Sequence, residues 1–465
     1  MVEHIHFYYT NDFHSYFSQW SRVASFMKGK KIKHRLKEES CWLIDIGDHL
    51  DRVHPITEAS MGKANVQVLN DVGYDMVTFG NNEGITLSHD DFYHLYDDAD
   101  FEVVCANLQN RAGDNPNWLN DYVQIQSIGG VRIGVIGLTV AFNDFYHLLH
   151  WHVSSPYEVL EKHLEILSEK VDVIVLLSHL GINWDRKIAS RFPKIDVIIG
   201  GHTHHLFKEG EYVGNTLLTA AGKNCFYVGE VHFEWDHKQQ KLVKKEAVAT
   251  DITEYPKDLI TEQSLFTLQK QSEDILNKEV VYLDESILVR WFKHTKIMQQ
   301  LTDSALNWTK AEGAMLNAGL LLDDFPAGAV TYADVHRICP HPINLCVVSI
   351  TGRNLMNVIQ TTLKREFTEL KLKGFGFRGE ILGKMIFSNI TFEKTRNTDG
   401  GFIISDVWIH GKPLEQNKTY QIATADSFTF GRLIPEIAQS ETKVYYLPEF
   451  LRDVLSKTLM DNYGI

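Results

Sequence analysis

Short apolar runs alternate with helical patterns through the first 250 residues of the chain. Each run ends in a polar segment that carries Asp, Asn or His. The runs are His4–Tyr9, Cys41–Ile46, Asp75–Phe79, Val171–Leu177 and Asp196–Ile199. Buried strands that alternate with helices predict a layered α/β domain. In such sheets, the polar segments at the carboxyl ends of the strands lie along one rim, where ligands bind.

The pattern changes near Glu254, where a polar helical stretch begins and runs to Lys278. A second series of strands and helices follows from Val280, with a helix expected around Thr295–Lys310. We therefore predict a first domain over residues 1–253, a linker helix over residues 254–280 and a second α/β domain over residues 281–465.

Composition and charge narrow the class of protein. Apolar residues make up 44% of the 465 residues and charged residues 23%, as in ordinary globular proteins. The formal net charge of −14 argues against a nucleic acid or an anionic membrane as a partner bound by bulk electrostatics. The chain shows no signal-peptide pattern and no C-x-x-C pair among its five cysteines. We therefore expect a cytoplasmic protein with reduced thiols and with no membrane or nucleic-acid partner.

Histidine is unevenly distributed, because 18 of the 22 histidines lie in the first 250 residues. Several of them follow the predicted strands, together with carboxylate and amide side chains. The resulting candidates for metal ligands are Asp12, His14, Asp48, Asn81, His179, His202 and His204. Carboxylate, imidazole and amide oxygen suit divalent transition ions, and one carboxylate can bridge two ions about 3.5–4 Å apart. If these segments stay extended, Asp12 and His14 share one face, as do His202 and His204.

The order of these motifs resembles the calcineurin-like metallophosphoesterases. The motifs are Asp12-x-His14, Gly47-Asp48, Gly80-Asn81, Ser178-His179-x-Gly181 and Gly200-Gly201-His202-Thr203-His204. With the region that follows, the chain is similar to the 5′-nucleotidase family, including its cytoplasmic bacterial branch without a signal peptide. The resemblance implies an N-terminal four-layer α/β/β/α sandwich and a C-terminal α/β substrate-binding domain of the nucleotidase type.

The same resemblance implies two divalent metal ions as cofactors. Asp12, His14, Asp48 and His204 would hold one ion, and Asp48, Asn81, His179 and His202 would hold the second, with Asp48 as the bridge. The ligand types suit Mn, Zn, Fe or Co about equally. A metal-bound hydroxide would attack phosphorus while the ions neutralise the phosphoryl oxygens.

The third motif departs from the family pattern GNHEFD. Asn82 stands where the family has the histidine of a catalytic dyad, and Ile85 stands where it has the aspartate. An asparagine can donate a hydrogen bond to a phosphoryl oxygen but cannot deliver a proton, and such help is typically worth about 10²–10⁴ in rate. Three outcomes follow: a slow enzyme, a substrate with a good leaving group such as a pyrophosphate, or a replacement acid.

The second motif supplies a candidate for that acid. We hypothesise that His49, with Asp51, partly replaces the dyad, and that Arg52 could touch phosphate. The alternative is that these residues form an exposed ion pair in a loop.

The resemblance also predicts the role of the second domain, where two aromatic rings would stack on a base and arginines would meet the phosphate. Asn317 begins the family's Asn-x-Gly turn, but Leu320–Leu322 replaces the usual Gly-Ile-Arg. Phe377 and Phe428 are the candidates for the two rings, and Arg378 is the candidate for the phosphate contact. The alternative is that they are core phenylalanines and a solvated arginine, since most of the 25 phenylalanines must be core.

Two hypotheses of function follow. The first is a phosphoester hydrolase that acts on nucleotides or on related small phosphorylated or pyrophosphate compounds. The second is a nucleotide-binding or sensory protein that keeps its metals but turns over weakly, because Asn82 and Ile85 replace the dyad. The intact set of metal ligands favours the enzyme, and the missing dyad favours the binding protein. The oligomeric state cannot be predicted from these residues.

Overall fold

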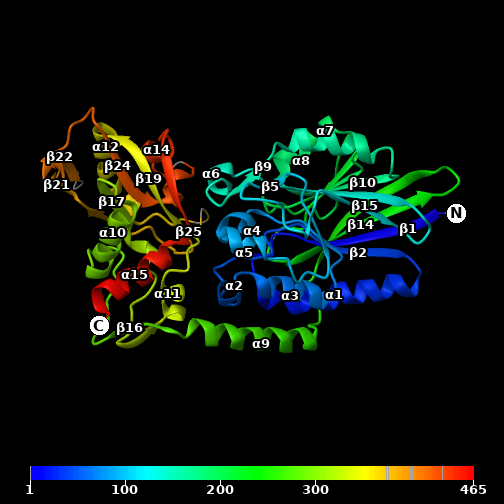
Figure 1. Cartoon of the computed structure of the whole chain (residues 1–465), viewed down its shortest axis with the longest axis horizontal. Coiled ribbons are helices and arrows are strands. Elements are labelled where there is room, and N and C mark those ends of the chain that lie inside the picture. Colours follow the sequence, from blue (N-terminus) through cyan, green and yellow to red (C-terminus); the bar gives the residue numbers. More distant parts are fainter. Residues whose placement is uncertain (1, 373, 375, 397–401, 432, 465) are drawn as a thin grey trace. The chain divides into compact units, whose positions relative to one another are not determined.

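The structure is a computed structural model that describes residues 2–372, 374, 376–396, 402–431 and 433–464. It divides into two compact units, Met1–Ser272 and Glu273–Ile465 (Figure 1). Helix α9 (Leu259–Leu276) contains the division and lies within the range expected for a linker helix. Among the described residues, no helix combines the length and the apolar character that crossing a membrane requires.

A seven-stranded sheet forms one half of the N-terminal unit, in the order β15-β14-β1-β2-β3-β4-β6. The strands from β1 to β6 in this order run parallel. On the other side of β1, β14 pairs antiparallel with β1, and β15 pairs antiparallel with β14. The bounds are β1 (Val2–Thr10), β2 (Ser40–Asp45), β3 (Met76–Val77), β4 (Glu102–Val104), β6 (Leu119–Asn120), β14 (Tyr227–Asp236) and β15 (Lys241–Asp251).

A six-stranded sheet forms the other half, in the order β12-β13-β11-β10-β8-β7. Its four central strands are parallel, and the two edge strands are antiparallel to their neighbours. The bounds are β7 (Tyr122–Gln126), β8 (Arg132–Thr139), β10 (Val173–His179), β11 (Val197–Gly200), β12 (Glu211–Val213) and β13 (Thr216–Thr219).

The inner faces of the two sheets pack against each other. Ile5, Phe7 and Tyr9 of β1 share one buried apolar cluster with Val175 of β10 and Ile199 of β11. Every second residue of a strand faces the same side, so the intervening residues of β1 face the opposite layer. This alternation places β1 between the apolar interior and a helical layer.

Helices cover the two outer faces, as Figure 1 shows for α1 and α3 on one side of the strands and for α7 and α8 on the other. Leu160 of α7 and Ile188 of α8 pack with Leu176 of β10. Tyr8 of β1 meets Phe26 of α1 edge to face. The order of layers confirms the predicted four-layer α/β/β/α sandwich. The bounds are α1 (Phe17–Leu36), α2 (Pro55–Ser60), α3 (Lys63–Val72), α4 (Asn81–Thr86), α7 (Pro156–Leu167) and α8 (Ile182–Arg191).

The C-terminal unit contains a five-stranded sheet in the order β20-β17-β24-β19-β25. Ile297 and Leu301 of α10 are fully buried, and α10 covers nearly the predicted helix range. This unit confirms the α/β substrate-domain fold. The bounds are α10 (Lys296–Thr309), β17 (Gly313–Asn317), α11 (Tyr332–Ile338), β19 (Asn344–Thr351), α12 (Gly352–Thr362), β20 (Met385–Ser388), β24 (Thr419–Ala425), β25 (Lys443–Phe450) and α15 (Leu451–Tyr463).

The packing between the two sheets should dominate the stability of the N-terminal unit. Leu177 is fully buried in the cluster between them, so Leu177→Ala should lower the free energy of unfolding by about 2–5 kcal/mol. Urea unfolding followed by circular dichroism measures this change. The matched control is Leu36→Ala, because Leu36 is 78% exposed and its loss should cost less than about 0.5 kcal/mol. Equal effects of the two substitutions would contradict the assigned core.

Candidate metal centre

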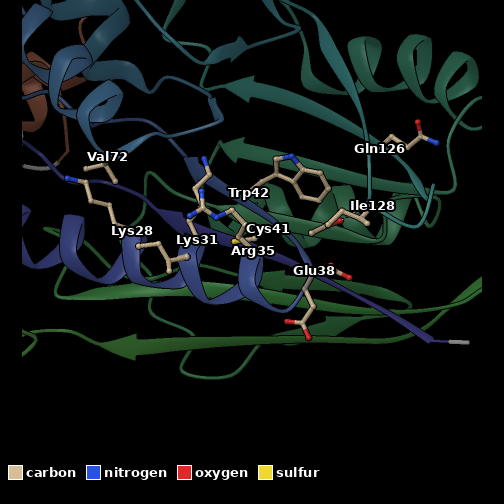
Figure 2. A pocket seen from close by; sticks show the side chains of 12 residues that line it. Lys28, Lys31, Arg35, Glu38, Cys41, Trp42, Val72, Gln126 and Ile128 are labelled. Atoms are coloured by element: carbon tan, nitrogen blue, oxygen red, sulfur yellow. Dashed lines mark hydrogen bonds between the residues drawn. The ribbon is translucent and has the colours of Figure 1, made fainter.

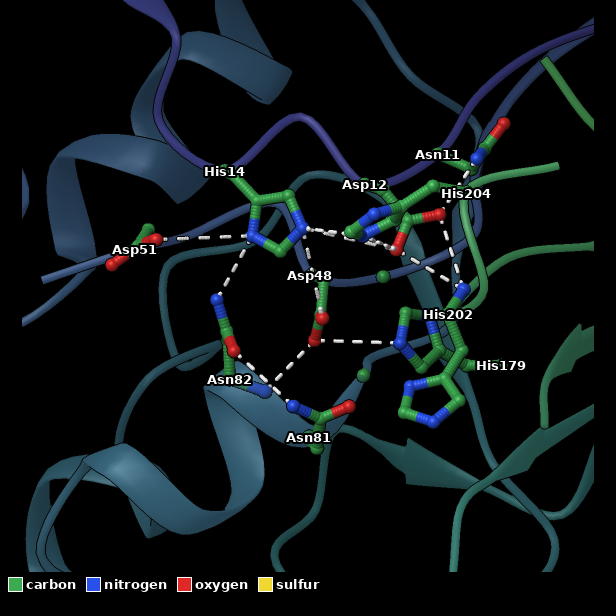
Figure 3. Close-up of polar contacts among 12 residues, drawn as sticks. Asn11, Asp12, His14, Asp48, Asp51, Asn81, Asn82, His179, His202 and His204 are labelled. Atoms are coloured by element: carbon green, nitrogen blue, oxygen red, sulfur yellow. Dashed lines mark hydrogen bonds and ion pairs between the residues drawn. The ribbon is translucent and has the colours of Figure 1, made fainter. Parts of the chain in front are cut away.

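The candidate metal ligands lie at the carboxyl ends of parallel strands from both sheets. Asp12 and His14 follow β1, and Asp48 follows β2. His179 ends β10, and His202 follows β11. Figure 3 shows these side chains turned toward one another, with Asp48 in the middle of the group. The predicted rim therefore brings together residues that are almost 200 positions apart.

The segments that carry the candidate ligands are not extended, which corrects the expectation of a simple alternation. The backbone φ is +50° at Asp12, +49° at His14, +48° at Asp48, +70° at His202 and +56° at His204. Residues other than glycine rarely adopt this left-handed region, and each such residue costs about 1–3 kcal/mol unless its surroundings impose it. Residues in this strained state cluster at functional sites, so the backbone supports a binding role.

Asp12, His14 and His204 form the first set of donor atoms, which all lie within 4.8 Å of one another. The Nε2 atoms of His14 and His204 are 3.0 Å apart, and the Nε2 atom of His204 is 3.5 Å from Oδ1 of Asp12. Two imidazole nitrogens at this distance need a shared proton or a cation between them. The backbone N–H of His202 donates to both oxygens of Asp12 and fixes that carboxylate.

Asp48, His179 and His202 form the second set, again within 4.8 Å. Oδ1 of Asp48 is 3.4 Å from Nε2 of His179, and its Oδ2 is 4.0 Å from Nε2 of His14 in the first set. Asp48 therefore faces both sets, as a bridging ligand must. Figure 3 shows the Asn81 side chain beside this second set.

The charges in the second set are strongly coupled. Burial alone would raise the pKa of Asp48, but the neighbouring imidazoles of His179 and His14 hold it well below its usual range. Burial alone would lower the pKa of His179, but the Asp48 carboxylate raises it to about 10. Burial, reinforced by the charge of His179, lowers the pKa of His202 to about 4.

Unpartnered buried atoms test whether these residues fit a metal. Among the described residues, Nε2 of His179 and Oδ1 of Asn81 are buried and have no hydrogen-bond partner. These two atoms face the same group of candidate ligands (Figure 3), and a coordinated ion would give both of them a partner. A Cβ atom on Gly80 would lie 2.2 Å from Oδ1 of Asp48 and 2.5 Å from Nε2 of His179, so only glycine fits there. The donor types and this close packing fit a pair of divalent transition ions.

Glu83 organises the loops of the site and is missing from the predicted site residues. Its carboxylate is 1% exposed and accepts the backbone N–H groups of Asp48 at 3.0 Å, Leu50 at 3.0 Å and Gly80 at 2.8 Å. It thus joins the loop after β2 to the start of α4. The signal in the sequence is a glutamate three residues after Gly80, the spacing of a helix cap.

Asn82 lies at the site and contacts two candidate ligands. Its side-chain nitrogen is 3.1 Å from Nδ1 of His14 and donates to the backbone oxygen of Leu50 at 2.9 Å. Its backbone N–H donates to Oδ1 of Asp48 at 2.8 Å. Asn82 therefore holds the orientation of His14 and Asp48. A contact from Asn82 to substrate stays a prediction.

The structure does not support His49 as the replacement acid. Its ring is 3% exposed and packs against Phe13 and Trp20, with Nδ1 3.2 Å from the side-chain nitrogen of Asn65. Burial lowers the pKa of His49 to about 3, so the ring is neutral near pH 7 and is not the imidazolium form that would act as an acid. That hypothesis is wrong for His49, because the ring turns into the core beneath α1.

The other residues of this segment also differ from the hypothesis. Oδ2 of Asp51 lies 3.9 Å from Nδ1 of His14, which places Asp51 behind a candidate ligand instead of beside His49. Arg52 forms a buried ion pair with Glu58, with its Nε 2.8 Å from the carboxylate. Its guanidinium is therefore engaged within the protein, and a contact from Arg52 to phosphate stays a prediction.

The predicted base-stacking pair in the C-terminal unit is also corrected. Phe377 is 3% exposed and stacks on His341 with the ring centroids 5.1 Å apart. Phe428 is 1% exposed and stacks on Phe367 at 6.5 Å. Both rings are already covered by protein, so they form part of the core.

The remaining two candidates of this unit have different surroundings. Asn317 is 1% exposed, and its side chain donates to the backbone oxygen of Leu382 at 2.8 Å, which is a structural role. Arg378 has an exposed side chain, and its backbone N–H donates to Nδ1 of His341. A phosphate contact by Arg378 stays a prediction.

Comparisons with known families agree with this arrangement. The calcineurin-like phosphoesterase family matches residues 5–206, and the 5′-nucleotidase C-terminal domain matches residues 271–431. The chain is therefore a phosphoric ester hydrolase by class. It belongs to the calcineurin-like metallophosphoesterases that carry a 5′-nucleotidase C-terminal domain.

Individual relatives match between about three quarters and nearly all of the chain. The metallophosphoesterase YunD of Bacillus subtilis strain 168 is 38% identical over 458 residues, which cover 98% of this chain and 99% of YunD. The trifunctional nucleotide phosphoesterase YfkN of the same organism is 26% identical over 423 residues, covering 76% of this chain and 27% of YfkN. The structure of the NAD nucleotidase NadN of Haemophilus influenzae has the same fold, with a TM-score of 0.70 at 16% identity, covering 99% of this chain and 97% of NadN.

The three hydrogen bonds of Glu83 should be required for tight metal binding. Glu83→Gln turns an amide NH₂ toward at least one backbone N–H, so the loop that carries Asp48 should shift. We expect metal affinity to fall by about 10–100-fold, as for other residues that orient metal ligands. Competition with a chromogenic chelator measures the affinity. Glu211→Gln, at a surface ion pair with Arg186, is the control, and an unchanged affinity in Glu83→Gln would contradict the assigned role.

The buried carboxyl group of Asp426, which lies near Phe428 in the sequence, should make the stability of the C-terminal unit depend on pH. Burial raises the pKa of Asp426 to about 7, against the opposing hydrogen bonds from the backbone N–H groups of Asn344 and Ser427. A carboxyl whose pKa is higher when folded stabilises the fold at low pH, and this contribution is lost as the pH rises toward 7. The free energy of unfolding of Asp426→Asn, taken relative to that of the parent, should therefore rise by more than about 1 kcal/mol between about pH 4.5 and pH 8. Urea unfolding at both pH values measures it, with Asp461→Asn on α15 expected to show no such trend.

Proposed function

We propose that the chain is a metal-dependent hydrolase of nucleotides or related small phosphorylated compounds. The observation that carries this proposal is the pair of donor sets that meet at Asp48. We assign Asp12, His14, Asp48 and His204 to one ion and Asp48, Asn81, His179 and His202 to the other. Two such ions, when bound, make a water acidic enough to ionise near neutral pH and neutralise phosphoryl charge.

The residues of the chain hold this arrangement in place. Asp48 presents one oxygen to each donor set, and the backbone N–H groups of Asn82 and His202 fix the carboxylates of Asp48 and Asp12. Asn82 also sets the ring of His14. These contacts pre-order the ligands, so that little reorganisation is needed when substrate binds. We propose divalent transition ions as a class, which includes Mn, Zn, Fe and Co, and do not choose among them.

The absence of a titrating group at position 82 favours one class of substrate. Without an acid, an alkoxide leaving group departs with its full charge, whereas a phosphate leaving group needs no proton near neutral pH. Since the His49 ring is buried against Phe13 and Trp20, we base the proposal on the two outcomes that need no acid from His49, a slow enzyme or a good leaving group. We therefore infer that phosphoanhydrides, such as nucleoside diphosphates or dinucleotides, are hydrolysed faster than simple monoesters. The family's C-terminal domain and the name of YfkN support a nucleotide as substrate.

The second candidate function is a nucleotide-binding or sensory protein with weak turnover. The replacement of the dyad by Asn82 and Ile85 is the observation that favours it. A cytoplasmic location and the lack of nucleic-acid and membrane partners remain predictions from composition and charge.

A substrate panel separates these functions. We expect Mn²⁺-dependent phosphate release that is faster for nucleoside diphosphates, dinucleotides and an aryl phosphate than for nucleoside monophosphates. Asp48→Asn should abolish it, because this residue faces both donor sets, whereas Asp90→Asn should leave it unchanged, because the Asp90 side chain is 91% exposed. Nucleotide binding by calorimetry without phosphate release in Mn²⁺, Zn²⁺, Fe²⁺ or Co²⁺ would favour the binding protein instead.

A further inference from the structure

Four histidine rings form a stack on the outer face of the seven-stranded sheet, away from the candidate metal centre. The ring centroids of His34 and His6 are 3.9 Å apart, those of His6 and His232 are 4.6 Å apart, and those of His232 and His4 are 5.2 Å apart. The strand pattern explains the alignment. His4 and His6 alternate with core residues along β1, and His232 of β14 lies directly opposite His6 in the register. His34 comes from the last turn of α1.

Within the stack, His6, His34 and Glu230 present a set of metal-ligand atoms that all lie within 4.8 Å of one another. His6 is 8% exposed and His34 is 2% exposed. Nδ1 of His6 donates to Oε1 of Glu230 at 3.0 Å. Two imidazoles and one carboxylate are a ligand combination that divalent transition ions use.

Glu39 holds the ring of His34 by a hydrogen bond and lies beside the ring of His6. Its Oε2 accepts from Nδ1 of His34 at 2.8 Å and lies 3.6 Å from Nε2 of His6. The nitrogens that face away from Glu39 are Nε2 of His34 and Nδ1 of His6, and Nδ1 of His6 would give up its proton and its hydrogen bond to Glu230 when it binds an ion. Nε2 of His34 now accepts from the Tyr8 hydroxyl at 2.9 Å, a group that can rotate away. A carboxylate behind a ligating histidine is the usual support of a metal site.

The groups carry the charges that a cation needs. Burial alone would raise the pKa of Glu230, but the hydrogen bond from His6 and the nearby charge of Lys30 help to lower it to about 2, so it is a carboxylate near neutral pH. Burial lowers the pKa of His34, which keeps the ring neutral and able to ligate. The ammonium of Lys30 lies 3.9 Å from Oε2 of Glu230 and supplies a positive charge that a bound ion would replace.

A pocket lies beside Glu39, although none of the three candidate ligands lines it. Glu39 lines a pocket of about 830 Å³ between α1 and β2, together with Cys41 and Trp42 (Figure 2). The Glu230 side chain is itself 23% exposed, so an ion can reach the cluster at this carboxylate. An entry path is one of the requirements for a metal site.

We propose that His6, His34 and Glu230 bind one divalent transition ion of the Zn²⁺ class at a third metal site, which fastens the end of α1 to β1 and β14. This proposal is independent of the proposed hydrolysis. The ligands come from three elements, so the ion would cross-link the helical layer to the sheet.

The test uses the full chain with Asp12→Ala and Asp48→Ala, in which the candidate metal centre is disabled. After loading with Zn²⁺ and gel filtration, elemental analysis should find one ion per chain, and Co²⁺ should give a visible absorption spectrum. Adding His6→Gln and His34→Gln should remove both signals. The matched control, His147→Gln with His152→Gln, changes a surface histidine pair whose nitrogens are 3.0 Å apart and should keep both signals. No retained ion in the parent, or an ion that survives His6→Gln with His34→Gln, would overturn the proposal.

A variant that should bind Zn²⁺ more tightly provides a second test, because misfolding can explain a loss of binding but not a gain. The Lys30 ammonium lies 4.8 Å from the centroid of the Phe26 ring. Lys30→Met keeps an unbranched side chain but removes this competing ammonium, so Zn²⁺ should bind at least several-fold more tightly. Hydrogen exchange of residues 30–39 should slow on addition of Zn²⁺, since the ion would hold the end of α1. Unchanged or weaker affinity in Lys30→Met, or unchanged exchange with Zn²⁺, would count against the site. Loss of the ion in Cys41→Ser would assign it to the pocket thiol and overturn the proposal as well.

Discussion

The burial of two sheet faces against each other is the constraint on which the candidate metal centre depends. Neither sheet carries a complete set of ligands. The seven-stranded sheet supplies Asp12, His14, Asp48 and Asn81, and the six-stranded sheet supplies His179, His202 and His204. The apolar layer between them fixes the distance between these groups. Close-packed interiors resist deformation, so the core acts as the frame that keeps donor atoms from opposite sheets within reach of one another.

Within this frame, local hydrogen bonds hold the loops of the site in an unusual backbone conformation. Several candidate ligands adopt left-handed φ values, which residues other than glycine rarely adopt unless their surroundings impose them. Glu83 and the Asp12 carboxylate each accept backbone N–H groups from the adjoining loops, and these bonds stabilise the strained segments. The ligand geometry therefore arises from packing at long range and from polar contacts at short range.

Local patterns in the sequence were sufficient to predict a layered α/β domain with polar residues along one rim, whereas the four-layer order and the assignment of metal ligands came from the resemblance to a family. Strand runs that end in Asp48 or His179 predict the rim, since parallel strands end at the same edge. The direction of individual side chains depends on contacts between distant segments and could not be predicted. His49 follows Asp48 directly in the chain, yet its ring packs under Trp20 of α1. Phe377 and Phe428 lie in loops of plausible composition, but partners from other elements cover their rings.

The placement of Asn82 has a consequence for how the family can diverge. Once the amide at this position supports both the Leu50 carbonyl and the His14 ring, it has become part of the scaffold. A histidine put back there would keep at most part of those contacts, and Ile85 would still lack the carboxylate that completes the dyad. Asn82→His alone would therefore not rebuild the family's dyad. Two linked positions separate this chain from that pattern, and a change at the first also removes support from the Leu50 carbonyl and the His14 ring.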